Sequence, residues 1–211
     1  MFIYLPLERS LLQTLPAGSV ILDLGCGDGS HLELLATGGF AVGADTSLPA
    51  LRRAVATSPV VAAEGEHLPF SAETFDLVYV SHVLHHAADP RALLDEVRRV
   101  LRPGGKLMLI ETCEDNPLMR LARTLRPEWE SVPVRSRFRY AELLDDVRGA
   151  GFTIHATEQF NVLYWVWGFA RRKFRPLERL LGVVIRLELM VGRWLRRYSA
   201  YGYVVGSKPS S

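Results

Sequence analysis

The sequence reads Val20-Ile-Leu-Asp-Leu-Gly-Cys-Gly-Asp-Gly-Ser30 near its N-terminus, and this stretch decides the fold. Its apolar first half predicts a buried parallel strand, and the amphipathic run that follows, His31–Ala36, predicts a helix. Between them, Gly25, Gly27 and Gly29 permit a tight turn in which a ligand can approach the backbone. A strand, a glycine turn and a helix N-terminus together indicate a nucleotide site at the carboxyl end of a sheet.

The composition is that of one ordinary globular domain. A chain of 211 residues can bury a sizeable core, and its shares of hydrophobic residues (48%) and charged residues (23%) are typical of such domains. Cys26 and Cys113 fall in separate predicted elements without metal-ligand spacing, which favours a reduced, cytoplasmic environment. The N-terminus has neither the basic start nor the cleavage site of a signal peptide. We therefore expect one cytoplasmic domain over residues 1–211.

Charge is distributed unevenly along the chain. Residues 160–211 hold ten basic and two acidic side chains, whereas the residues before them hold 15 basic and 21 acidic ones. A basic, apolar C-terminal section on an acidic body suggests an anionic surface or substrate near the C-terminus.

Strand and helix patterns alternate along the chain. Besides the helix over 31–36, helices are predicted over 7–15, 90–101, 117–125 and 140–150, and one more after the cap Thr46-Ser-Leu-Pro49. The predicted strands are 20–24, 40–44, 60–63, 75–80, 106–111, 152–160 and 201–205. Asp89-Pro90 is a typical helix start, and Arg102-Pro-Gly-Gly105 is a typical stop. This alternation predicts a doubly wound α/β sheet.

The segment Val20–Glu111 resembles the core of a class I S-adenosylmethionine-dependent methyltransferase of the small-molecule methyltransferase-11 type. Blocks in the family's order carry the resemblance: Leu22-Asp-Leu-Gly-Cys-Gly-Asp-Gly29, Gly43-Ala-Asp45, His67-Leu-Pro-Phe70, Thr74-Phe-Asp-Leu-Val78 and Arg99-Val-Leu-Arg-Pro-Gly-Gly-Lys106. The resemblance implies S-adenosylmethionine as cofactor. It also implies a Rossmann-like seven-stranded sheet in the order 3-2-1-4-5-7-6, with the last strand antiparallel.

Two acids bear on the choice of cofactor. Asp45 ends the second predicted strand, 20 residues after Gly25, where a carboxylate can accept hydrogen bonds from ribose hydroxyls. That arrangement suits NAD as well, so a dehydrogenase is an alternative. Asp23 precedes the first glycine, and a carboxylate there suits a cationic amino-acid ligand better than a pyrophosphate. Asp23 and the methyltransferase blocks together favour S-adenosylmethionine.

The resemblance assigns the other cofactor contacts by position. The cofactor-binding residues expected from it are Asp23, Gly25, Cys26, Gly27, Asp45, Thr46, Glu64, Gly65, Ser81 and His82. The glycine turn would hold the methionine part, Thr46 would lie beside the ribose or adenine, and Glu64-Gly65 would meet the adenine amino group. Glu64 is one methylene longer than the usual Asp, and an exposed loop acid is an equal alternative for it.

Methyl transfer from a sulfonium needs little covalent help, because the donor is already activated and alignment supplies most of the acceleration. A base is required only where the acceptor loses a proton during attack. The candidates are His82, His85 and His86 after the fourth strand, and Glu111 at the end of the fifth. We expect His82 or His86 near the acceptor, with a reaction that uses no dedicated base as the favoured alternative. Adjacent histidines on a helix point apart, so no metal site is expected.

A helical insertion is predicted over residues 161–198, between the sixth and seventh strands. About forty residues are too long for an ordinary connection, and their apolar runs are too short to span a bilayer. Three interpretations stay open. The insertion is a lid on the protein's own core, an interfacial element on the inner membrane face, or a dimer interface.

The sequence therefore predicts an S-adenosylmethionine-dependent methyltransferase for a small, hydrophobic or lipid-like acceptor. An RNA methyltransferase is one alternative because the C-terminal section is basic. Its basic residues alternate with Leu and Val and not with stacking aromatics, which argues against nucleic acid as a partner. A non-catalytic cofactor-binding assembly protein is another alternative, against which the intact Gly25, Gly27 and Asp45 argue. The acceptor atom and the oligomeric state stay open.

Overall fold

The computed structural model describes residues 5–54, 58–125, 134–162 and 181–210. Its strands are β1 (Val20–Leu24), β2 (Phe40–Asp45), β3 (Val60–Ala62), β4 (Phe75–Ser81), β5 (Leu101–Thr112), β6 (Thr153–Phe160) and β7 (Tyr201–Ser207). They form one sheet in the order β3-β2-β1-β4-β5-β7-β6, which confirms the predicted order. β7 is antiparallel to β5 and β6, and the other neighbouring pairs are parallel.

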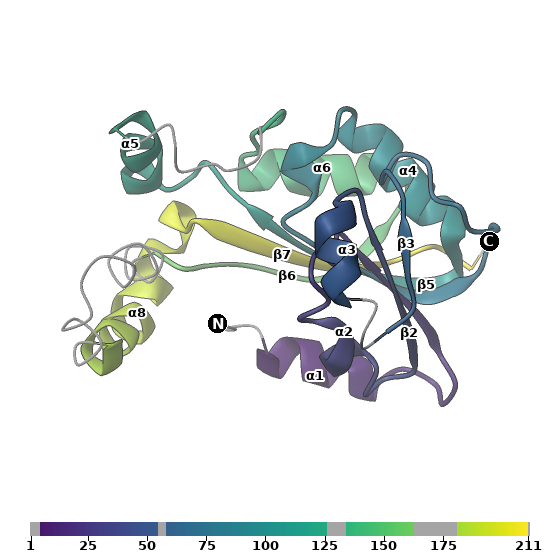
Figure 1. Ribbon diagram of the computed structural model, residues 1–211. Coiled ribbons are helices and arrows are strands. Elements are labelled where there is room, and N and C mark those ends of the chain that lie inside the picture. Colours follow the sequence, from purple (N-terminus) through teal and green to yellow (C-terminus); the bar gives the residue numbers. More distant parts are fainter. Residues whose placement is uncertain (1–4, 55–57, 126–133, 163–180, 211) are drawn as a thin grey trace.

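Helices cover both faces of this sheet (Figure 1). The helices are α1 (Leu5–Gln13), α2 (Leu32–Leu35), α3 (Leu48–Ala54), α4 (Pro90–Val100), α5 (Pro117–Leu125), α6 (Tyr140–Gly149) and α8 (Leu181–Leu195), with the 3-10 turns η1 (Leu84–His86) and η4 (Arg196–Tyr198). One core lies between the sheet and helices α4 and α6, and a second lies under α1, α2 and α3. The central strands are buried on both sides, which explains why they read as nearly continuous apolar runs.

The start of β5 differs from the prediction. Leu101 already pairs with Phe75, and the regular register with β4 resumes only at Lys106 opposite Leu77. The residues between form an irregularity in which Gly104, at φ +77°, donates its N–H to the carbonyl of Lys208. The predicted helix stop is therefore also the first part of a strand, because its backbone groups pair with the C-terminal residues of the chain.

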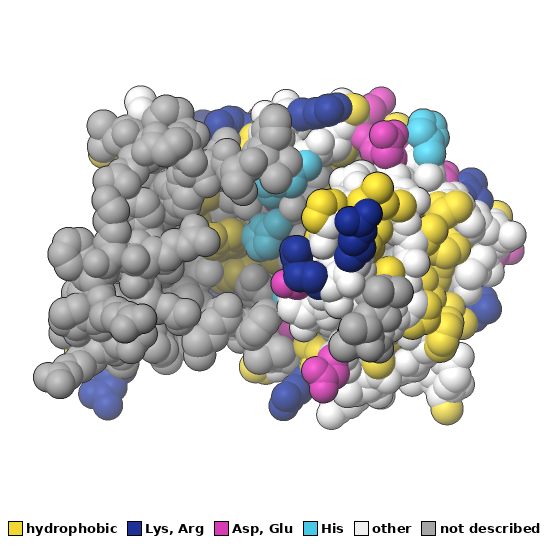
Figure 2. Space-filling view, in the orientation of Figure 1, with side chains coloured by type: hydrophobic (Ala, Val, Ile, Leu, Met, Phe, Trp, Pro, Cys, Tyr) yellow, Lys and Arg dark blue, Asp and Glu magenta, His cyan; other side chains and the backbone are white. Residues whose placement is uncertain are grey.

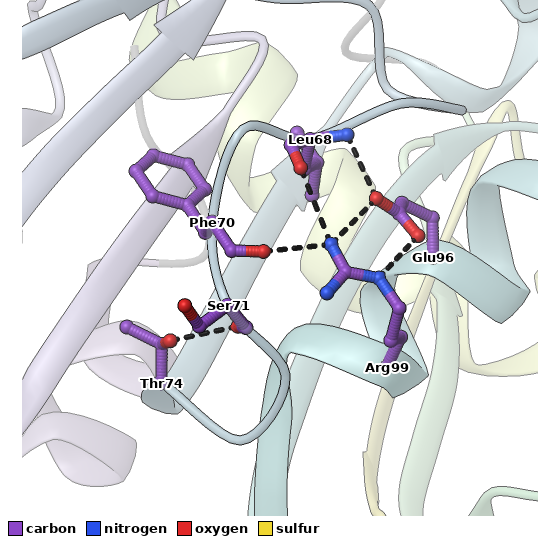
Figure 3. Close-up of polar contacts among 6 residues, drawn as sticks. All are labelled: Leu68, Phe70, Ser71, Thr74, Glu96 and Arg99. Carbon is purple, nitrogen blue, oxygen red and sulfur yellow. Dashed lines mark hydrogen bonds and ion pairs between the residues drawn. The ribbon is translucent and has the colours of Figure 1, made fainter.

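Helix α4 begins and ends as predicted, and it fixes the loop before β4. Asp89 accepts hydrogen bonds from the N–H groups of Arg91 and Ala92 at 2.9 and 3.1 Å. Near the other end, the Arg99 guanidinium donates to the carbonyls of Leu68 and Phe70 (Figure 3). Glu96 accepts the Leu68 N–H at 2.8 Å and two further bonds from Arg99. The segment after Glu64-Gly65 is thus held by one ion-paired arginine.

Helices α5 and α8 extend from one end of the sheet, beyond the end of β5 (Figure 1). Asn116 donates from Nδ2 to the carbonyl of Val162 at 3.0 Å, and Val162 donates its N–H to Glu188 of α8 at 2.8 Å. Of the predicted insertion, residues 163–180 lie outside the described residues, and 181–198 are helical. Among the described helices, each is too short or too polar to cross a membrane.

Candidate functional site

The glycine turn lies at the carboxyl end of β1. Gly25, Gly27 and Gly29 have φ values of +78°, +55° and +81°, which favour glycine over residues with a Cβ. The N–H groups of Gly25 and Cys26 both donate to the carbonyl of Ala44 in β2, at 2.7 and 3.1 Å. A Cβ on Gly25 would lie 2.1 Å from Val83, whereas a Cβ on Gly27 would meet no atom within 4 Å. Gly27 therefore faces open space, and Gly25 packs tightly against the segment that follows β4.

Asp45 closes this turn from the end of β2. One of its oxygens accepts the Gly27 N–H at 2.8 Å, and the other accepts the Ser47 N–H at 2.7 Å. A carboxylate has about four lone-pair positions, so Asp45 can accept further bonds from a ligand while it holds the turn. Thr46 is exposed beside it. The predicted ribose acid thus lies next to the predicted backbone cradle.

Asp23 lies beneath the turn and is almost fully buried, at 3% exposed. Burial, followed by the charges of Asp45 and Glu8, raises its pKa from 3.8 to about 7. Its Oδ2 is buried and accepts no hydrogen bond from the described part of the chain. A buried carboxylate oxygen without a donor suits a cationic group, which is the role that Asp23 was predicted to have toward an ammonium.

Glu8 is a second buried acid near Asp23. No sequence motif identified it. It is 1% exposed, and its Oε1 accepts the Tyr79 hydroxyl at 2.5 Å while its Oε2 has no donor among residues of the described ranges. Tyr79 pairs with Asp23 across β1 and β4, so α1 places a second carboxylate near the first. The available signal was the helix pattern, because Glu8 occupies the apolar face that Leu11 and Leu12 define.

The remaining residues expected to bind the cofactor lie in two places, in the loop before β4 and at the end of β4. Glu64 is exposed, and Gly65 is buried where a Cβ would approach Leu93 of α4 to 2.6 Å. A larger residue at position 65 would therefore push the loop away from α4. Ser81 and His82 are half-buried at the end of β4, and His82 has an uncommon φ of +57°.

Three histidines and two side chains from the end of β5 form a polar cluster after the end of β4. His82 Nδ1 lies 3.2 Å from Thr112 Oγ1, and His85 Nδ1 lies 2.5 Å from Oε1 of the fully buried Glu111. The rings of His85 and His86 lie 3.9 Å apart between centroids. The expectation that adjacent histidines point apart was wrong, because these two belong to the 3-10 turn η1 and not to an α-helix.

An aromatic surface continues from this cluster toward the last two strands. The Tyr201 ring packs edge-on against His82, with centroids 5.3 Å apart, and stacks on Phe160 at 5.7 Å. These rings lie where β6 ends and β7 begins, next to the helical insertion. They provide apolar contact area at the edge of the cluster.

In the described residues, no side chains are arranged for thiol or metal chemistry. Cys26 and Cys113 are buried and unpaired by disulfides, and burial raises the pKa of the Cys26 thiol to about 12. Over the described ranges, no three His, Cys, Asp or Glu side chains converge with metal-binding geometry.

Comparison with known proteins finds a family model and several relatives that match about half of the chain. The model of a methyltransferase domain matches residues 22–109. Demethylmenaquinone methyltransferase of Corynebacterium urealyticum is 43% identical over 99 residues, which are 46% of this chain and 43% of the relative. A tRNA (carboxymethyluridine(34)-5-O)-methyltransferase of Schizosaccharomyces pombe is 32% identical over 106 residues, 49% of this chain and 46% of the relative. The chain thus spans less than half the length of these curated relatives.

Solved structures extend the likeness to the whole chain at the level of the fold. An S-adenosylmethionine-dependent methyltransferase from Mesorhizobium loti superposes with a TM-score of 0.67 at 23% identity, covering 96% of both chains. Phosphoethanolamine N-methyltransferase 2 of Haemonchus contortus, solved with S-adenosyl-L-methionine, gives a TM-score of 0.71 at 15% identity over 97% of this chain and 52% of that one. The predicted Rossmann-like fold is confirmed.

Proposed function

We propose, from the match of residues 22–109 to a methyltransferase domain and from the fold shared with S-adenosylmethionine-dependent enzymes, that this protein methylates a small hydrophobic acceptor. The observation that carries the proposal is the glycine turn set between two acids. Asp45 holds the Gly27 N–H from one side, and Asp23 lies buried on the other with an oxygen that lacks a donor in the described residues. S-adenosylmethionine carries ribose hydroxyls toward one end and an ammonium at the other. Each of these groups suits a carboxylate of the protein.

The residues present fit S-adenosylmethionine, which supplies a methyl group already activated on a positively charged sulfur. Asp23 would face the ammonium, Gly27 would let the methionine part approach the backbone, and Asp45 would accept from the ribose. Thr46, Glu64 and Gly65 would border the adenine side, and Ser81 and His82 the methionine side. The Asp23 carboxyl, with its pKa raised to about 7, would become fully ionised when a cation binds beside it.

We propose that the acceptor is quinone-like and apolar. Support comes from the demethylmenaquinone methyltransferases of Corynebacterium urealyticum and of Mycobacterium sp. (strain JLS), the second of which is 39% identical over 114 residues. The rings of His82, Tyr201 and Phe160 pack on one another at the edge of the site, and this aromatic character is compatible with the same acceptor class.

Helix α8 supports contact with a membrane surface, from which such an acceptor would be taken. Val183, Leu187, Met190 and Trp194 are exposed and recur every three or four residues, so they share one face of the helix. Arg186 and Arg197 are exposed near the two ends of this face. An apolar stripe flanked by arginines matches the pattern of a helix that lies in an anionic interface.

An RNA acceptor is the second candidate, because one relative methylates tRNA and the C-terminal section is basic. The exposed side chains of α8 argue against it. Among the side chains of α8 that the structure describes, three of the four large exposed apolar ones are aliphatic, and Trp194 is the one that could stack on a base.

Calorimetry with S-adenosylmethionine tests the proposed function. We expect binding by the parent protein and a loss of affinity of at least about tenfold in Asp45→Ala, because a charge-assisted hydrogen bond is worth roughly 1.5–3 kcal/mol. Asp145→Asn is the matched control, since Asp145 is an exposed acid of α6 paired only with Arg148 in the described structure. Transfer of a labelled methyl group to demethylmenaquinol and to tRNA then separates the two acceptors. A parent protein that does not bind S-adenosylmethionine would refute the proposal.

A further inference from the structure

Glu111 and His85 form a buried hydrogen-bonded pair at the mouth of the site. Glu111 is fully buried at the end of β5, and its Oε1 lies 2.5 Å from His85 Nδ1. The same carboxylate accepts the Thr112 N–H at 2.6 Å and the His85 N–H at 3.3 Å. Glu111 therefore holds both the backbone and the ring of His85.

The contacts of this pair determine which ring nitrogen carries a proton. Burial alone would raise the pKa of Glu111, but the hydrogen bond from His85 and the neighbouring charges of His85 and His82 hold it below the ordinary value. Glu111 is thus a carboxylate at neutral pH, and a carboxylate can only accept. The hydrogen bond then assigns the proton of the neutral ring to Nδ1, which leaves a lone pair on Nε2.

The second ring nitrogen is available to a ligand. The His85 side chain is 14% exposed although Glu111 is fully buried, and Nε2 has no hydrogen bond to any described residue. Its position is firm because the His85 carbonyl accepts the N–H groups of Arg135 and Ser136 at 2.9 and 3.1 Å. Figure 2 shows histidine side chains reaching the surface near the middle of one face, next to hydrophobic side chains.

η1 also lies close to the glycine turn. Val83, which precedes η1, occupies the space that a Cβ on Gly25 would need. The N–H of His82 donates to the carbonyl of Ile110 at 2.9 Å, so the start of η1 is tied to the end of β5 as well. His85 therefore stands on a short rigid turn between the proposed cofactor cradle and the proposed acceptor side.

We propose that His85 is the general base of the methyl transfer and that Glu111 is its positioning residue. This inference rests on the proposed function and adds that the acceptor is a hydroxyl compound, such as a quinol. Each methyl group transferred to a hydroxyl compound releases one proton. The proton moves from the acceptor O–H to His85 Nε2 and then passes to water. The electron pair left on the acceptor allows it to form the new bond to the methyl group, while the methyl–sulfur bond breaks and its electron pair stays on the sulfur of the departing S-adenosylhomocysteine. Glu111 stabilises the imidazolium while His85 holds the proton.

The neighbouring histidines are less suited to this role. His82 Nδ1 is held by the Thr112 hydroxyl, which offers no charge to stabilise an imidazolium. Burial lowers the pKa of His82; Glu111 opposes this shift, and the neighbouring histidines add to it more weakly. The ring of His86 packs against the ring of His85, and it is His85 that makes the hydrogen bond to Glu111. The proposal for His85 thus departs both from the expectation of His82 or His86 and from the favoured alternative of a reaction without a dedicated base.

Two experiments test the pair, one of them without any acceptor. The ¹⁵N spectrum of the histidine rings should show His85 in the Nδ1–H form in the parent protein and a mixed population in Glu111→Gln. His85 in the Nε2–H form would overturn the inference whatever the acceptor proves to be. Calorimetry with S-adenosylmethionine should give the parent affinity in both His85→Ala and Glu111→Gln, which separates a failure of the pair from a failure of the proposed function.

Kinetics with a short-tailed demethylmenaquinol as probe supply the second experiment. His85→Ala should lower kcat by roughly 10²–10⁴-fold with KM changed by less than about threefold, and added imidazole should restore part of the rate. Glu111→Gln should lower kcat by about tenfold or more, because the imidazolium loses its counter-charge. His155→Gln, an exposed histidine of β6, should match the parent. A His85→Ala variant with parental kcat would show that no base acts at this position.

Discussion

Gly27 and Gly18 share a backbone conformation but differ in what lies beside them. Their φ values are +55° and +80°, and a Cβ on either would meet nothing within 4 Å. Gly18 lies in the turn before β1, whereas the space beside Gly27 is where we propose the methionine part of the cofactor. Alanine should cost each position the same backbone strain, about 1–2 kcal/mol.

The first prediction uses this matched pair. Gly27→Ala and Gly18→Ala should lose similar free energies of unfolding in urea, but only Gly27→Ala should bind S-adenosylmethionine more weakly, by about tenfold or more, because its methyl group enters the cofactor space. Calorimetry and urea denaturation measure the two quantities on the same samples. Equal affinities in the two variants would place the cofactor elsewhere. Gly25→Ala is unsuitable as a test, because its Cβ would collide with Val83.

Asp23 links the stability of the protein to pH. Its pKa is raised to about 7 by burial and by the charges of Asp45 and Glu8, so the folded state keeps a proton that the unfolded state has already released. Between the ordinary carboxyl pKa of 3.8 and about 7, its contribution to stability therefore falls as the pH rises. A shift of this size corresponds to an upper value of about 4 kcal/mol.

The second prediction follows from the sign of this linkage. Without cofactor, Asp23→Asn should be more stable than the parent protein, and its advantage should grow from about pH 4 to pH 7 and then level off. The same variant should bind S-adenosylmethionine more weakly, since the ammonium loses its carboxylate. Urea unfolding across this pH range, together with calorimetry, measures both effects. A variant that is no more stable than the parent at about pH 8 would contradict the raised pKa.

At the scale of elements, α4 and the loop before β4 depend on the geometry of one side chain. The Arg99 guanidinium bonds two carbonyls of the loop and both oxygens of Glu96, and this hydrogen bonding lowers the pKa of Glu96 (Figure 3). A lysine keeps the charge but lacks the planar fork that reaches these acceptors together.

The third prediction is that Arg99→Lys destabilises the protein by about 1–3 kcal/mol, the range expected for lost hydrogen bonds to charged groups. Arg148→Lys should change stability very little, because Arg148 makes an exposed pair with Asp145. Thermal unfolding at neutral pH compares the two. The difference should shrink in acid, because stabilisation from a group whose pKa is lowered is lost as the pH falls through that pKa. Equal melting temperatures would mean that the loop is held in another way.

The order of elements could be predicted because their signals are local. The glycine turn after β1, Asp89-Pro90 before α4 and the alternating apolar runs each depend on neighbouring residues, and the strand order then followed from the family resemblance. The longer β5 could not be predicted this way. Gly104 joins the strand only because Lys208, far along the chain, accepts its N–H.

The arrangement of the candidate site could be predicted where a motif names its residues, but not where contacts join distant segments. Asp23, Gly27 and Asp45 come together as expected, since the carboxyl ends of β1 and β2 are neighbours. The link between Glu8 and Tyr79 spans 71 residues, and the link between His85 and Glu111 spans 26. Such pairs depend on strand register, which a single sequence does not specify.

For the whole molecule, the proposed site and the most exposed apolar surface lie toward the same end of the sheet. α5 follows β5, which ends beside Glu111, and α8 leads through η4 into Tyr201 of β7 (Figure 1). Leu118 and Leu121 of α5 are more than half exposed, as are Val183, Met190 and Trp194 of α8. A hydrophobic acceptor held in a bilayer would therefore meet this end of the protein first.

The fourth prediction is that this surface binds anionic vesicles. The parent protein should float with vesicles of phosphatidylglycerol and phosphatidylcholine, and less so at high salt, because arginines flank the apolar stripe. Met190→Ser and Trp194→Ser, at 69% and 82% exposed, should reduce flotation without lowering the melting temperature. Phe40→Ser is the matched control, since Phe40 is equally prominent, at 60% exposed, but lies at the start of β2. Unchanged flotation in both α8 variants would exclude α8 as the contact, and a dimer that dissociates in the same variants would identify this face as an interface between two copies.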